Sequence, residues 1–91
     1  MPIDTGPLVE IYVNSWCPYC AAARALLGDK RARITEINVD EFPERRTEMI
    51  ARSGRHTVPQ IFIDSMHVGG YDDLTAMERM GKLDPLLRSN H

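Results

Sequence analysis

The chain has 91 residues, which is the length of one ordinary domain, so we expect a single domain over residues 1–91. Its apolar fraction of 43% and charged fraction of 26% are those of a globular protein and exclude a disordered tail. With 11 basic and 13 acidic residues the net charge is -2, which disfavours a dedicated nucleic-acid binder because no basic excess is present to neutralise phosphates.

The N-terminal segment predicts a strand and no export signal. Residues 1–7 contain Asp4 and no basic residue, and the apolar run Leu8–Val13 is short and interrupted by Glu10. Neither a secretory signal nor a membrane span has this pattern, so we expect a cytoplasmic protein without a membrane partner. The same run is partly β-branched and predicts a buried strand.

The segment after this strand predicts a helix that begins at Cys17. Residues 14–16 form a loop in which Ser15 is a candidate cap, and Pro18 suits a first helical turn because it has no N–H to leave unpaired. An alanine-rich run follows and Gly28 is the expected end of the helix. Residues 33–39 then alternate apolar and polar side chains and predict a second strand.

A second helix is predicted from residues 40–43, where acidic side chains lie at the positive end of the helix dipole and Pro43 takes a first-turn position. Gly54 is its expected end. The apolar run Gln60–Ile63 predicts a third strand.

A hairpin and two further helices complete the predicted elements. Residues 66–68 predict a fourth strand, and the two-residue connection 64–65 is so short that strands three and four must pair antiparallel. An acidic residue caps a third helix, and a last short helix starts at Asp84. The order is therefore βαβαββα plus a short C-terminal helix. Because a β–α–β start implies parallel strands, the sequence predicts an α/β fold with a four-stranded mixed sheet flanked by helices.

Both cysteines of the chain lie in one CPYC motif, as Cys17 and Cys20. Cys17 is predicted at the N-terminus of a helix, where unpaired backbone N–H groups and the helix dipole favour a thiolate over a thiol. Cys20 lies one turn further on the same side, in a less exposed position and within reach of a disulfide. This context predicts a redox pair with Cys17 as nucleophile and Cys20 as resolving thiol.

Other uses of the two cysteines fit less well. A structural disulfide framework needs more cysteines and wider spacing. Two unreactive cysteines within a helix are a further possibility, but a CxxC motif placed between a strand and the start of a helix is typical of a redox pair. A zinc site needs four ligands, and the histidines at 56, 67 and 91 do not form a spaced pair, so we expect no metal.

Three motifs follow one another along the chain: CPYC at 17–20, TVP at 57–59 and GGYDD at 69–73. In this order and spacing, over residues 8–87, the chain resembles the dithiol glutaredoxins, in particular the bacterial glutaredoxin 3 group. The resemblance implies a thioredoxin fold and a cis peptide bond before Pro59. It also implies a glutathione-dependent thiol–disulfide oxidoreductase that reduces protein disulfides and glutathione mixed disulfides, in electron transport and cell redox homeostasis.

The resemblance further implies a groove for glutathione. The residues that match the family's glutathione-binding positions are Tyr19, Arg46, Thr57, Val58, Pro59, Gly70, Tyr71 and Asp72. The backbone of Val58 would pair with the cysteine of glutathione, and residues 70–72 would bind its γ-glutamyl end. Taken without the family, TVP also fits an ordinary turn, and Asp72 or Asp73 also fits a helix cap, so which carboxylate is the ligand stays open.

The glycine end of glutathione is where the chain departs from the family. A lysine usually stands three residues before the nucleophilic cysteine, and that position is Asn14 here. Arg46 matches a family Gln/Arg position that contacts the glycine carboxylate, and it fits a solvated charge beside Arg45 equally well. Trp16 fits either an apolar lip for docking proteins or a cover for loop backbone.

The resemblance implies glutathione as the reducing co-substrate and disulfide-bonded or glutathionylated proteins as targets of a monomer. Glutathione reductase and NADPH would act indirectly. Two alternatives stay open. A redoxin reduced directly by thioredoxin reductase would not need the GGYDD segment. A glutathione-ligated 2Fe-2S cluster carrier typically has a single cysteine followed by a small residue, so Pro18 and Cys20 both depart from it.

Overall fold

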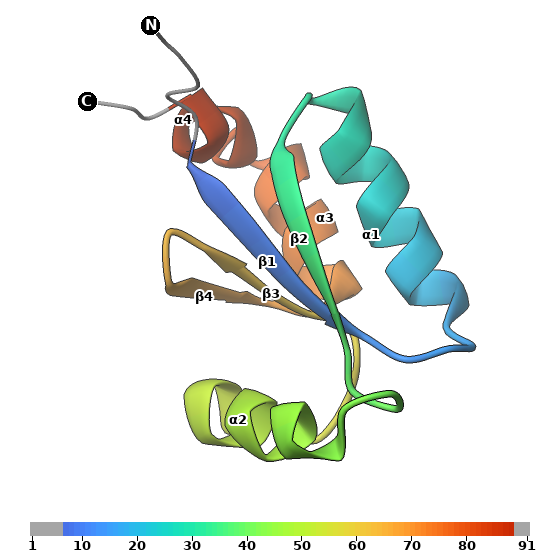
Figure 1. The fold of residues 1–91 in the computed structure, drawn as a ribbon. Coiled ribbons are helices and arrows are strands. Elements are labelled where there is room, and N and C mark those ends of the chain that lie inside the picture. Colours follow the sequence, from blue (N-terminus) through green and yellow to red (C-terminus); the bar gives the residue numbers. More distant parts are fainter. Residues whose placement is uncertain (1–6, 89–91) are drawn as a thin grey trace, which may run out of the picture.

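The computed structural model describes residues 7–88. The strands are β1 (Leu8–Val13), β2 (Arg33–Asn38), β3 (Gln60–Ile63) and β4 (Met66–Gly69). The helices are α1 (Pro18–Asp29), α2 (Pro43–Ser53), α3 (Tyr71–Arg79) and α4 (Leu83–Arg88). The element order is the predicted one (Figure 1). No helix within residues 7–88 combines the length and the apolarity that crossing a membrane requires.

The four strands form one mixed sheet in the order β2-β1-β3-β4. β1 pairs parallel with β2, and β3 pairs antiparallel with both β1 and β4. Helices α1 and α3 cover one face of the sheet and α2 covers the other (Figure 1). The predicted α/β class, the four-stranded mixed sheet and the antiparallel hairpin are confirmed.

Both faces of the sheet are buried, which explains why β1 and β3 are almost continuously apolar. On the α1 and α3 side, Val9 and Ile11 of β1 pack against Leu27 and Leu74. On the α2 side, Tyr12 packs with another set of buried residues, which are Ile37, Val39, Met49 and Phe62. The loops at the ends of these strands are therefore attached to a packed core.

The ends of α1 differ from the prediction. Ser15 is not the cap: Cys17 occupies the N-cap position, and its sulfur accepts a hydrogen bond from the Cys20 N–H. Gly28 does not end the helix, which continues to Asp29 and is capped by Lys30. The Lys30 ammonium lies 3.0 Å from Glu78 and 2.7 Å from Asp84, so contacts with α3 and α4 fix this end.

The ends of two other elements were also predicted wrongly. β2 stops at Asn38, one residue early, because the Asn38 Oδ1 accepts the backbone N–H groups of Asp40 and Glu41 and turns the chain. Neither Asp72 nor Asp73 is the N-cap of α3, because Gly70 holds that position. Asp73 instead reaches back from the first turn and accepts the Gly70 N–H at 2.9 Å.

Candidate functional site: a cysteine pair beside a groove

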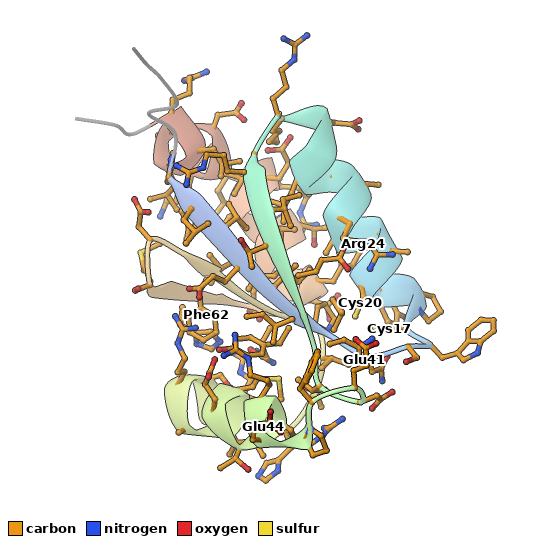
Figure 2. The ribbon with its side chains drawn as sticks, in the orientation of Figure 1. Cys17, Cys20, Arg24, Glu41, Glu44 and Phe62 are labelled. Carbon is orange, nitrogen blue, oxygen red and sulfur yellow. The ribbon has the colours of Figure 1, made fainter. Side chains whose placement is uncertain are left out.

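The two cysteines lie side by side at the start of α1, in different environments (Figure 2). Cys17 is half-buried, and its Sγ accepts a hydrogen bond of 3.1 Å from the Cys20 N–H. Cys20 is 1% exposed and packs in the core with Ala23 and Leu27. Both are free thiols. The pair therefore presents one accessible sulfur and keeps the second directly behind it.

Burial also controls the protonation of the second sulfur. Burial, followed by the hydrogen bond with Cys17, raises the pKa of the Cys20 thiol to about 12. A hydrogen bond from the Asn14 backbone and the charge of Arg24 lower it less. Cys20 is therefore a thiol at neutral pH in the reduced protein.

Alkylation of the reduced protein tests this difference. At pH 7, we expect limiting iodoacetamide to modify Cys17 and to leave Cys20 unmodified, because Cys20 is both buried and protonated. Mass spectrometry of the digested protein measures the two positions separately. A sample unfolded in urea is the control, since both cysteines should react there. Labelling of Cys20 at the rate of Cys17 in the folded protein would contradict the assignment.

A cavity of about 300 Å³ opens beside Cys17. Its lining contains seven of the eight residues predicted to bind glutathione, which are Tyr19, Thr57, Val58, Pro59, Gly70, Tyr71 and Asp72. The Val58 carbonyl oxygen lies 3.9 Å from the Cys17 Sγ, which places the accessible sulfur at the edge of this groove. The Val58–Pro59 peptide bond is cis, as expected.

Two tyrosines form an aromatic wall of the groove. The rings of Tyr19 on α1 and Tyr71 on α3 have centroids 5.9 Å apart and are tilted by 35°. Tyr19 is 62% exposed. The wall thus joins the helix that carries the cysteines to the helix that closes the groove.

The two acidic residues at the start of α3 have different roles in the fold. Asp73 accepts hydrogen bonds from the Arg55 guanidinium and from the Gly70 N–H, both at 2.9 Å. These two hydrogen bonds hold the pKa of Asp73 below its ordinary value, and the bond from Arg55 has the larger effect. The Asp72 carboxylate lines the groove, is exposed, and has no side-chain partner among residues 7–88. Asp72 is therefore the carboxylate open to a ligand.

The arginine that lines the groove is not the one expected from the sequence. Arg46 does not line the cavity: its guanidinium donates to the His56 carbonyl at 3.3 Å and lies 3.6 Å from Asp40. Arg55 is instead the cation in the lining, and the sequence reasoning missed it. Its position two residues before the TVP motif was the available signal.

The remaining candidate residues lie around the cysteine loop or away from it. The Asn14 Oδ1 is buried and has no hydrogen-bond partner within the described chain. Trp16 is 88% exposed next to Cys17. His56 is exposed, His67 pairs with Gln60, and His91 lies outside the described residues. Residues 7–88 contain no group of three or more side chains arranged to hold a metal.

Comparisons with known proteins agree with the motifs. The glutaredoxin family model matches residues 9–68. Glutaredoxin 3 of Escherichia coli K12 is 55% identical over 80 residues, covering 88% of this chain and 96% of that protein. Glutaredoxin of Pseudomonas aeruginosa is 53% identical over 81 residues, covering 89% and 96%.

Solved structures give the same result for the fold. The solution structure of glutaredoxin from Brucella melitensis has a TM-score of 0.80 and 55% identity, covering 93% of this chain and 92% of that one. The crystal structure of a buckwheat glutaredoxin–glutathione complex has a TM-score of 0.82 and 28% identity, covering 89% and 76%.

Proposed function

The chain belongs to the glutaredoxin family and is a glutathione-dependent thiol–disulfide oxidoreductase; on this premise we propose how its residues divide the reaction. The observation that carries the proposal is the placement of an accessible sulfur, Cys17, at the edge of the groove with a buried thiol, Cys20, behind it. Cys17 is the nucleophile and Cys20 the resolving thiol.

With a glutathionylated protein, Cys17 alone is sufficient. Its thiolate attacks the glutathione sulfur, the bond between the two substrate sulfurs breaks, and the protein leaves as a thiolate that takes up a proton. Cys17 is then joined to glutathione. A second glutathione thiolate attacks the glutathione sulfur of this mixed disulfide, which forms glutathione disulfide and restores the Cys17 thiolate.

With a protein disulfide, both cysteines take part. Cys17 attacks one sulfur of the target and forms a mixed disulfide with it. Cys20 then attacks the Cys17 sulfur, the reduced target leaves, and the Cys20 proton passes to the departing thiolate. Two glutathione molecules reduce the resulting Cys17–Cys20 disulfide.

We propose that glutathione lies along the groove with its cysteine beside Val58, as a short antiparallel strand addition. The backbone N–H groups of Tyr71 and Asp72 at the start of α3 take the γ-glutamyl carboxylate, since the Gly70 N–H is already donated to Asp73, and the open Asp72 carboxylate takes the ammonium group. Tyr19 and Tyr71 pack against the peptide, and Thr57 and Pro59 line its path. The meeting of these residues in one cavity supports this orientation.

Two arginines are proposed for the two carboxylates of glutathione. Arg55 reaches the start of α3 through Asp73, so it assists at the γ-glutamyl end. Arg46 serves the glycine carboxylate, and for this it has to leave its contacts with Asp40 and His56. Asn14 supplies no charge here, which makes Arg46 more important than it would be beside a lysine.

The proposed cellular setting follows from this chemistry. The targets are disulfide-bonded or glutathionylated proteins, and glutathione reductase with NADPH keeps the glutathione pool reduced. We propose that the protein acts in the cytoplasm as a monomeric single domain over residues 1–91 and needs no metal.

The source of electrons tests the proposal. Oxidised protein is mixed with NADPH and either glutathione plus glutathione reductase or thioredoxin reductase alone, and NADPH consumption is followed. We expect re-reduction with the glutathione system only, because the groove is proposed to hold the glutathione tripeptide. Re-reduction by thioredoxin reductase alone would favour the redoxin alternative. A coloured dimer after anaerobic purification would favour the cluster carrier.

A further inference from the structure

A buried amide lies directly behind the TVP loop. Gln60 is the first residue of β3, and its side chain is 1% exposed. Burial of an amide is unfavourable unless its donors and its acceptor find partners. Both ends of this amide do. Its Nε2 lies 3.1 Å from the Thr57 carbonyl oxygen and 3.3 Å from the Thr57 Oγ1, and its Oε1 lies 2.7 Å from the His67 Nε2.

The direction of these hydrogen bonds follows from their chemistry. A carbonyl oxygen only accepts, so the Gln60 Nε2 donates to Thr57 and the Gln60 Oε1 accepts from His67. The His67 Nε2 therefore carries the hydrogen. The His67 ring is itself fixed, since it lies 5.0 Å from the ring of Phe62 in the core. A chain of three hydrogen bonds thus runs from β4 through Gln60 to the loop.

This chain sets the orientation of the Thr57–Val58 peptide. In a trans peptide the carbonyl of one residue and the N–H of the next point in opposite directions. With the Thr57 carbonyl held toward the buried Gln60, the Val58 N–H points away from the interior, on the side where Val58 lines the groove. Among residues 7–88 no group accepts from this N–H.

We propose that Gln60 and His67 are positioning residues for the reaction: they hold the Thr57–Val58 peptide so that the Val58 N–H faces glutathione before it binds. Neither residue is in the lining of the groove. They order the loop before glutathione binds, so that binding does not have to supply the free energy of ordering it. This role rests on the proposed function of the groove.

Steady-state kinetics with a glutathionylated peptide tests the proposal. Gln60→Met keeps the length of the side chain and removes its hydrogen bonds, so the apparent KM should rise about tenfold while kcat changes by less than about twofold. His67→Leu removes the donor to Gln60 and should also raise KM. His67→Gln restores an N–H donor of similar reach, and its KM should stay within about twofold of the wild-type value.

Ile63→Val is the control that distinguishes an effect on loop position from a general loss of stability. Ile63 is buried at the opposite end of β3, and its truncation lowers the free energy of unfolding without touching the hydrogen-bonded chain. Its KM should remain that of the wild type. In the ligand-free protein, the amide proton shift of Val58 in ¹H–¹⁵N spectra should move in Gln60→Met and His67→Leu and stay in place in Ile63→Val.

The proposal is overturned if Gln60→Met and His67→Leu leave KM and the Val58 amide shift unchanged, or if Ile63→Val raises KM as much as they do. A wild-type protein with no activity in the glutathione-coupled assay would instead overturn the proposed function. An active wild type with an unmoved KM in the variants overturns only the positioning role.

Discussion

Replacing Cys17 with serine should lower the turnover of glutathionylated substrates by about a thousandfold or more, because a serine hydroxyl is a far weaker nucleophile than a thiolate. The buried Cys20 cannot replace it, since the residue is 1% exposed and its thiol has a pKa raised to about 12 by burial and by the Cys17 hydrogen bond. The measurement is NADPH consumption coupled through glutathione reductase.

The matched variant is Cys20→Ser. It should keep the removal of glutathione from glutathionylated substrates and lose the reduction of protein disulfides, because only the second reaction needs an internal resolving thiol. Activity retained in Cys17→Ser would reject Cys17 as the nucleophile. Equal losses in both assays for Cys20→Ser would reject the route that uses Cys17 alone.

Gly69→Ala should lower the free energy of unfolding by a large amount. Gly69 has a φ of +120°, which side-chain-bearing residues rarely adopt. A Cβ there would lie 2.3 Å from the Asp73 Oδ2 and 2.7 Å from its Cγ. Asp73 would have to release the Gly70 N–H and Arg55. We expect roughly 2–4 kcal/mol of stability to be lost, the sum of backbone strain and a broken helix cap, as measured by urea unfolding.

The same variant should bind glutathione more weakly, because the α3 N-terminus and Arg55 both lose their anchor in Asp73. Gly28→Ala is the control. Gly28 lies in the last turn of α1, where an added Cβ would meet nothing within 4 Å outside the backbone of its own helix, so alanine should add about 0.5–1 kcal/mol. If Gly69→Ala were as stable as the wild type, the contacts of Asp73 with the Gly70 N–H and Arg55 would not contribute to stability as we expect.

The interior of the fold was predictable because its pattern is simple. β1 and β3 begin and end at the predicted residues, since both are apolar runs buried on both faces of the sheet. Gly54 ends α2 as expected, in the left-handed conformation that glycine favours. The ends of α1 were not predictable, because a cysteine sulfur caps its start and contacts distant in sequence fix its end. The start of α3 was predicted too late in the sequence, because an acidic residue that fits an N-cap also fits the first-turn position from which Asp73 binds the Gly70 N–H.

The site was predictable to the extent that it lies in motifs. Six of the expected glutathione-binding residues line one cavity because TVP and GGYDD flank the β3–β4 hairpin, and the seventh, Tyr19, comes from the CPYC motif on α1. Arg55 was missed because an arginine in a loop has no periodicity to reveal it. The pairing of Gln60 with His67 was also not predicted, because the register between β3 and β4 is irregular and the sequence spacing does not indicate it.

The Cys17 sulfur is both the nucleophile and the N-cap of α1. Once this sulfur enters a disulfide it is a weaker acceptor, so the cap stabilises the reduced protein more than the oxidised one. A cap of about 1 kcal/mol corresponds to about 20 mV of reduction potential for a two-electron couple. The capping bond therefore makes the protein a slightly stronger oxidant, and the end of a helix helps to set the direction in which electrons move between this chain and glutathione.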